Sequence, residues 1–229
     1  MGYELRPTGW PLEVGLQIDT SIDQTLRVPC LEPVLSLLGA YPETTLLRHV
    51  RPTRAKLAEA LRTGPASDQI LFFCCHGQQE GDLTHLSFDE GYLVLSDRGR
   101  DPQAVRITPD DIRLWMDMKE FDRRPLVFLN ACGAGQLNSI FYSSFGRTFL
   151  GLGASSVVGA QTDLPAVFAG EFARRFFAAL LKGGPENKVG WVLFRLRREL
   201  ASCHHNPLGL IYTLYRGADS YLPRAVDED

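Results

Sequence analysis

The sequence has 229 residues, of which 45% are hydrophobic and 22% are charged, and its formal net charge is -3. This length suits one large domain with a substantial core, and the slightly acidic balance excludes the basic surface that nucleic acid or an anionic membrane would need. No apolar run approaches the roughly 20 residues of a membrane-spanning helix, and the start lacks the basic-then-apolar form of a signal peptide. Five cysteines, an odd number, favour reduced thiols in a cytoplasmic protein over a disulfide framework.

The first part of the chain alternates strand and helix patterns. Residues 12–19, LEVGLQID, alternate apolar and polar side chains, which predicts a half-buried strand. Residues 31–40 favour a short helix, and residues 44–50 favour a short strand. The amphipathic pattern of residues 53–64 then predicts a helix that ends at Gly64.

Three continuous apolar runs predict strands that are covered on both faces: 69–75 (QILFFCC), 125–131 (PLVFLNA) and 155–160 (SSVVGA). Between the first two, residues 91–97 resemble a hairpin strand. A helix is expected to begin in the segment ITPDDI, with Thr108 as its cap.

The last part of the chain predicts two helices, over residues 167–184 and 189–201, and a closing strand over 208–217. Apolar strands separated by helices imply an α/β fold with a mostly parallel sheet and helices on both faces.

Two of the apolar runs lead into reactive side chains, His76-Gly77 and Cys132-Gly133. Ligands bind outside the carboxyl ends of parallel strands, so adjacent strands would bring His76 and Cys132 to one rim. A thiol has a pKa of about 8.5 and needs a base, which an imidazole can supply. The ordinary alternative is that the cysteine is buried filler and the histidine a turn residue, and the pattern alone leaves both interpretations open.

Two clusters raise the question of zinc: CCH at 74–76 and CHH at 203–205. Adjacent ligands on a strand point to opposite faces, and neither cluster has C-x-x-C spacing. We therefore expect no metal and no cofactor, and we expect Cys74 and Cys75 to be core residues.

The segments FFCCHG and LVFLNACGAG resemble the CHAT domain, a caspase-like cysteine peptidase module related to separase and often attached to tetratricopeptide repeats. The resemblance extends over most of the chain, through FDEGYLVLSD, ITPDDI and GLGASSVVGA to LGLIYTLYRGAD. It implies a caspase-like fold, with His76 as the base and Cys132 as the nucleophile. The backbone N–H groups of Gly77 and Cys132 would form the oxyanion hole. We expect one such domain over 1–229, with an N-terminal strand and helix portion (1–64) and a catalytic core (65–229).

The sequence departs from the family after the third apolar run. Many relatives carry Leu-Trp there, whereas this chain has AQTDLPAVF. Asp163 matches the position of an acidic residue that holds Arg or Lys at P1, the residue before the cleaved bond, in relatives specific for basic residues. Asp163 is thus the candidate residue for the S1 pocket, which binds the P1 side chain. The alternative is that Asp163 caps the following helix. In that case a preference for a hydrophobic residue at P1 remains an open alternative.

We therefore expect a cytoplasmic cysteine endopeptidase that hydrolyses a protein substrate through a Cys/His dyad. A sensor, such as a tetratricopeptide-repeat partner, would regulate it in a bacterial defence or cell-death pathway. No nucleic-acid or membrane partner is expected. The alternative is a catalytically silent caspase-like module that binds a protein partner, although the presence of both His76 and Cys132 favours the enzyme.

Overall fold

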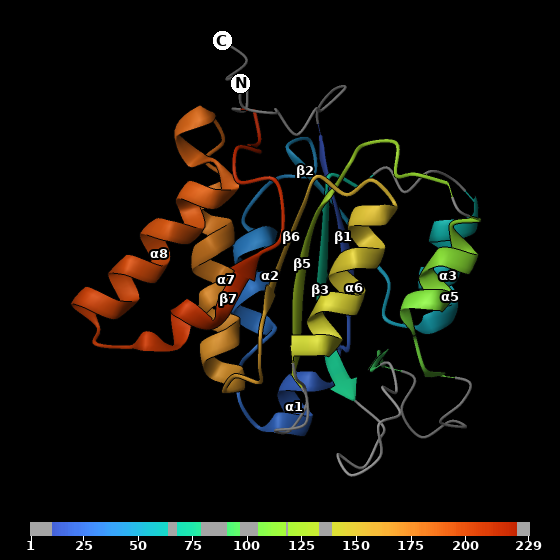
Figure 1. Cartoon of the computed structure of the whole chain (residues 1–229), viewed down its shortest axis with the longest axis horizontal. Coiled ribbons are helices and arrows are strands. Elements are labelled where there is room, and N and C mark those ends of the chain that lie inside the picture. Colours follow the sequence, from blue (N-terminus) through green and yellow to red (C-terminus); the bar gives the residue numbers. More distant parts are fainter. Residues whose placement is uncertain are drawn as a thin grey trace.

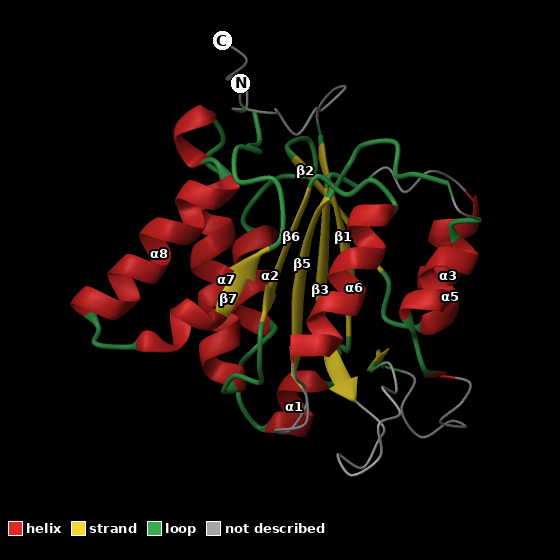
Figure 2. Ribbon diagram, in the orientation of Figure 1, coloured by secondary structure: helices red, strands yellow, loops and turns green. Residues whose placement is uncertain are grey.

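The chain folds around one sheet that collects strands from both halves of the sequence (Figures 1 and 2). The computed structural model describes residues 11–63, 68–78, 91–96, 105–117, 119–132 and 139–223, with the side chains of 78, 132 and 139–143 outside the description. The strands are β1 (Leu12–Ile18), β2 (Leu46–Val50), β3 (Ile70–Gln78), β4 (Tyr92–Val94), β5 (Leu126–Cys132), β6 (Ser156–Ala160) and β7 (Tyr212–Leu214). The helices are α1 (Ile22–Leu26), α2 (Glu32–Gly39), α3 (Arg54–Thr63), α5 (Pro109–Trp115), α6 (Ser139–Gly151), α7 (Ala166–Leu180) and α8 (Val189–Cys203), with 3-10 turns η1 (Pro185–Asn187) and η2 (Pro207–Ile211).

The sheet is mostly parallel, as the sequence predicts. Its strand order is β2-β1-β3-β5-β6-β7, and β4 pairs with β3 away from this path. The pairs β2-β1, β1-β3, β3-β5 and β5-β6 are parallel. Strands β4 and β7 run antiparallel to their neighbours β3 and β6. The carboxyl ends of β1, β3, β5 and β6 therefore meet at the same edge of the sheet.

Helices cover both faces of the sheet, which confirms the predicted α/β architecture. Helices α2, α7 and α8 lie on one face, and α3, α5 and α6 on the other (Figure 1). The first face buries an aromatic cluster in which Phe72 and Phe128 of the sheet meet Phe177 of α7, with ring centroids 5.4 and 5.3 Å away. Each of these side chains is at most 1% exposed, and burying one such ring stabilises the fold by about 1.5–3 kcal/mol.

The expectation of a half-buried β1 is wrong, because both faces of this strand are covered. The polar side chain of Gln17 is 0% exposed, and Gly15 faces a buried ion pair in which Arg51 donates to Asp68 over 2.6 Å. A Cβ at Gly15 would collide with the Arg51 guanidinium. The alternation of apolar and polar residues in β1 thus reflects a buried polar network rather than contact with water.

Helix α5 begins where its capping residue indicates. Thr108 caps α5 through a capping box, in which its hydroxyl accepts from the Asp111 N–H at 3.1 Å and its own N–H donates to Asp111 at 2.9 Å. Helix α7 ends at Leu180, before the expected Gly183-Gly184, and the predicted end of α3 at Gly64 lies outside the described residues.

The closing strand is shorter than expected, and two helices were not anticipated. Residues 207–211 form η2, because the Asn206 side chain accepts from the Leu208 N–H at 3.0 Å and Pro207 opens the turn. Only Tyr212–Leu214 pair with the sheet. Helices α1 and α6 were absent from the prediction. Among the described helices, none has the combination of length and apolar character that crossing a membrane requires.

Candidate active site

His76 and Cys132 are paired positions in the sheet. β3 and β5 run parallel, and their register matches Ile70 with Leu126 and continues to His76 with Cys132. Both residues therefore stand at the same level, at the carboxyl ends of adjacent strands, as the sequence predicts. The Cys132 side chain lies outside the described residues, and so does the distance from its sulfur to the imidazole.

The strand does not stop at the histidine, contrary to expectation. β3 continues to Gln78 because β4 pairs with its last three residues, and His76 faces Val94 in that ladder. The candidate oxyanion donor Gly77 lies within this pairing, opposite Leu93. His76 is thus held between two strands, Cys132 on one side and Val94 on the other, and its side chain is only 15% exposed.

A buried carboxylate that the sequence analysis missed lies beside the histidine. The Asp19 side chain is 0% exposed, and its Oδ2 is 3.6 Å from His76 Nε2. This separation is within ion-pair range but too long for a hydrogen bond.

Asp19 is fixed by its own backbone and by the turn that follows. Its N–H donates to the Cys74 carbonyl at 2.9 Å, which ties the end of β1 to the strand that carries His76. Its Oδ1 accepts from both the N–H and the hydroxyl of Ser21, at 2.9 and 2.7 Å. These bonds hold Oδ1 on the turn and leave Oδ2 directed at the imidazole.

The end of β5 is anchored by Asn130, two residues before Cys132. Asn130 is 3% exposed; its Nδ2 donates to the Ala169 carbonyl of α7 at 3.3 Å, and its Oδ1 accepts from the Tyr212 hydroxyl at 2.8 Å. Tyr212 stacks on Phe172 with ring centroids 3.9 Å apart. The sequence analysis did not single out Asn130, because its partners come from α7 and β7, which lie far along the chain.

Asp163 lies in the loop between β6 and α7 and is partly buried. Because β6 is parallel to β5, this loop leaves the sheet at the edge where His76 and Cys132 stand. The N-cap position of α7 is Pro165, whose own side chain makes no capping hydrogen bond. Asp163 lies two residues before this position, and both interpretations of it, as S1 residue and as helix cap, stay predictions.

One group of described residues, Glu13, His49 and Asp68, brings potential metal-ligand atoms within 4.8 Å of one another. Both carboxylates are already paired with arginine side chains: Glu13 accepts from Arg123 at 3.0 Å, and Asp68 accepts from Arg51 at 2.6 Å. Two guanidinium groups disfavour a bound metal cation here, and the group lies near the start of β1 and β3, far along both strands from His76. We interpret it as a partly buried ion-pair network.

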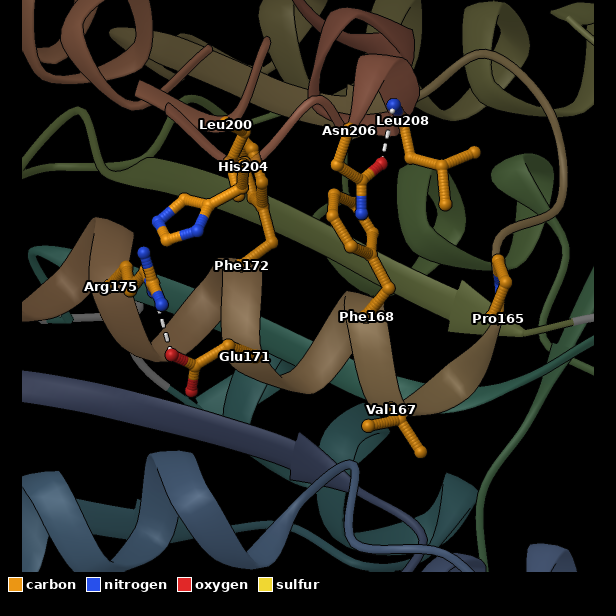
Figure 3. Close-up of a pocket in the computed structure, with 10 residues that line it drawn as sticks. All are labelled: Pro165, Val167, Phe168, Glu171, Phe172, Arg175, Leu200, His204, Asn206 and Leu208. Carbon is orange, nitrogen blue, oxygen red and sulfur yellow. Dashed lines mark hydrogen bonds and ion pairs between the residues drawn. The ribbon is translucent and has the colours of Figure 1, made fainter. Parts of the chain in front are cut away.

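A surface hollow of about 440 Å³ lies between α7 and the segment formed by α8 and η2 (Figure 3). Phe168 and Phe172 line it from α7, and Leu208 lines it from η2. At this hollow Glu171 accepts hydrogen bonds from Arg174 and Arg175. The hydrogen bond from Arg174, together with that from Arg175, outweighs the effect of burial and lowers the pKa of Glu171 to about 2. The hollow includes neither His76 nor Asp163 in its lining.

Comparison with known proteins decides the family. The model of the CHAT domain family matches residues 32–189, which include both His76 and Cys132. The chain belongs to the CHAT domain family. A search of curated proteins found no match.

Solved structures similar to this CHAT domain have low sequence identity. The chain is similar to separase in a Saccharomyces cerevisiae separase–securin complex solved at 2.6 Å, with 13% identity and a TM-score of 0.49 over 94% of this chain and 12% of separase. A second structure of that complex gives 15% identity and a TM-score of 0.46, again over 12% of separase. Protein GSU0716 from Geobacter sulfurreducens gives 15% identity and a TM-score of 0.47 over 81% of this chain and 89% of its own.

Proposed function

We propose that this CHAT domain is a cysteine endopeptidase that hydrolyses a peptide bond in a protein substrate, with His76 as the base and Cys132 as the nucleophile. The observation that supports it best is the register of the two strands, which sets His76 and Cys132 directly opposite each other at the carboxyl edge of the sheet. A buried carboxylate beside the imidazole adds the third group that such nucleophilic sites commonly use.

The chemistry follows from these positions. The thiol proton of Cys132 moves to the imidazole, and the thiolate attacks the carbonyl carbon of the scissile bond. The backbone N–H groups of Gly77 and Cys132 would stabilise the oxyanion. As the C–N bond breaks, the imidazolium returns the proton to the leaving amine. His76 then takes a proton from water, whose attack on the thioester releases the acid and restores the thiol.

Substrate choice and regulation are part of the proposal. Asp163 would line the S1 pocket and favour Arg or Lys at P1, because a partly desolvated carboxylate gains more from a cation than bulk water allows. Activity would take place in the cytoplasm, in keeping with the reduced state of the described cysteines Cys30, Cys74, Cys75 and Cys203. A sensor, such as a tetratricopeptide-repeat protein, would switch it on in a defence or cell-death pathway.

A positional-scanning library of quenched peptides tests the proposal. Wild type and Cys203→Ser, which removes an exposed thiol outside the site, are expected to cleave the same peptides. Cys132→Ala and His76→Ala are expected to lose cleavage. An enzyme that requires an activator would not cleave the peptides by itself. A second measurement therefore compares the rate at which iodoacetamide alkylates Cys132 with the rate at which it alkylates Cys203. A Cys132 thiol no more reactive than Cys203 at pH 6, together with no cleavage, would contradict the peptidase proposal and favour the silent module.

A further inference from the structure

We propose that Asp19 is a positioning residue for His76. Its buried carboxylate holds the imidazole through Nε2, selects the tautomer that carries the proton there, and so leaves Nδ1 as the nitrogen that takes the proton from Cys132. The inference rests on the proposed peptidase function, although its first consequence, the state of His76, can be measured without any substrate.

The first argument is the geometry of the carboxylate. Asp19 is 0% exposed, and one of its oxygens stands 3.6 Å from Nε2 of His76. A buried carboxylate close to an imidazole accepts a hydrogen bond from the ring N–H in the neutral form and stabilises the imidazolium in the charged form. With Nε2 directed at Asp19, the second ring nitrogen, Nδ1, is the one available to a thiol.

The second argument is that the carboxylate is rigidly held. Its backbone N–H is bonded to the Cys74 carbonyl, its carbonyl accepts from the Ile22 N–H at 3.1 Å, and Oδ1 accepts twice from Ser21. Such an anchored group can fix a ring orientation at little entropic cost, because its own rotamer is already set.

The third argument concerns the other titratable groups around His76. From β1 and the turn that follows, the charged neighbour is Asp19; the nearby Asp23 directs its oxygens at the backbone N–H groups of Cys30, Leu31 and Glu32 instead. From β4 the described residues are Tyr92, Leu93 and Val94, none of which is charged near neutral pH. From β5 the group is Cys132 itself. Asp163 lies on the loop after β6, on the far side of β5 from β3. Among the described residues of β1, β4, β5 and the turn after β1, Asp19 is thus the charged group in contact with the ring.

In the proton step, the Cys132 S–H bond breaks and an N–H bond forms at Nδ1, so that thiol and neutral imidazole become thiolate and imidazolium. The positive charge then lies between the Cys132 thiolate and the Asp19 carboxylate. Without that carboxylate, the imidazolium is less stable, and the thiolate fraction at neutral pH falls.

The experiment is NMR of protein labelled with ¹⁵N-histidine, in which the His76→Gln spectrum assigns the His76 signals among the five histidines. Wild type is expected to show the tautomer with hydrogen on Nε2. In Asp19→Asn the pKa of His76 should fall by about one to three units, and the alkylation rate of Cys132 at pH 6 should fall at least tenfold. Asp19→Glu should restore part of both. Asp68→Asn removes an equally buried, ion-paired carboxylate at the start of β3 and should leave both unchanged.

The outcomes separate the two proposals. Hydrogen on Nδ1 in the wild-type ring would overturn the positioning role, even if Asp19→Asn fails to fold. An unchanged His76 pKa in Asp19→Asn would also overturn the positioning role. If that variant loses cleavage after Arg and Lys but keeps cleavage after apolar residues, Asp19 would be a specificity residue instead. The third outcome is a lowered His76 pKa in Asp19→Asn together with a wild-type Cys132 that is alkylated no faster than Cys203. This result would support the contact between Asp19 and His76 and overturn the peptidase proposal.

Discussion

His76 of β3 and Cys132 of β5 are register partners in a parallel ladder, so one hydrogen-bonded pair of strands sets their separation. Neighbouring strands lie about 4.8 Å apart, so the two backbones are close at this level of the sheet. The rest of the site is attached to this pair: β4 extends β3 beyond the histidine, and Asn130 ties the end of β5 to α7. Because the pairing uses backbone groups, a change of the Cys132 side chain should leave this register in place.

Cys132→Ala is expected to abolish cleavage while leaving cooperative unfolding within about 0.5 kcal/mol of wild type, because a small rim residue contributes little to a core. The matched control is Cys74→Ala on the adjacent strand. Cys74 is 0% exposed, so its loss should cost roughly 1 kcal/mol and leave cleavage intact. Urea unfolding and peptide cleavage on the same preparations check both. Substantial turnover by Cys132→Ala would count against the dyad.

Asp163→Asn is expected to reduce kcat/KM for substrates with Arg or Lys at P1 by roughly ten- to a hundredfold and to spare substrates with an apolar P1, because the amide keeps the shape but loses the charge. The melting temperature should change little if Asp163 lines the S1 pocket, whereas a capping role would lower the stability by about 0.5–2 kcal/mol and affect all substrates alike. Parallel P1 profiles and thermal melts measure the two effects. An unchanged P1 profile would remove Asp163 from the S1 pocket.

Gly170→Ala is expected to destabilise the protein by about 1–3 kcal/mol through overpacking. A Cβ at Gly170 of α7 would lie 2.5 Å from the backbone carbonyl oxygen of Cys30, and the backbone there has no flexible side chain that can move aside. Gly151→Ala at the end of α6 is the control, because nothing lies within 4 Å of its Cβ. That change should stabilise the protein by up to about 1 kcal/mol. Equal unfolding midpoints for the two variants would contradict the close approach of α7 to Cys30.

The sheet and the pair at its edge were predictable because they depend on local patterns. Runs such as 69–75 and 125–131 are apolar on both faces, and such strands are stable only between two helical layers. Once both are placed in a parallel sheet, the residues that follow them, His76 and Cys132, must meet at one edge. The capping residues Thr108 and Asp111 likewise act within one turn of chain, and α5 begins where they indicate.

Features that depend on partners distant in the sequence were not predictable. Asp19 is an ordinary turn residue until β1 is placed beside β3, and nothing near it in the sequence indicates His76. Gln17 looks solvent-facing until Arg51 and Asp68 close over β1. Helix α6 carries Ser, Phe, Thr and Gly, which are weak helix formers; it is stabilised by tertiary packing of Phe145 and Phe149, which are 0% and 1% exposed.

Asp23 provides a test of the fold in which pH is the variable. Burial alone would raise the pKa of its carboxyl, but N–H groups of Leu31, Cys30 and Glu32 donate to it, and together they lower its pKa below the ordinary value of 3.8. These donors lie at the start of α2, whose N-cap Leu31 offers no capping side chain. Asp23 therefore caps α2 from α1, and Asp23→Ala should cost about 0.5–2 kcal/mol at pH 7.

The sign of the pH dependence follows from the lowered pKa. A carboxyl whose pKa is lower in the folded than in the unfolded state stabilises the fold fully above the unfolded value, and this contribution is lost as pH falls through the folded value. The gap in unfolding free energy between wild type and Asp23→Ala should thus be constant from pH 7 to about pH 5 and shrink below 3.8. Asp110→Ala, whose carboxylate is 74% exposed beside Arg113, should change stability by about 0.5 kcal/mol or less throughout. Urea unfolding at pH 7, 5 and 3 measures the gap, and a gap that widens toward pH 3 would show that Asp23 does not act through its charged form.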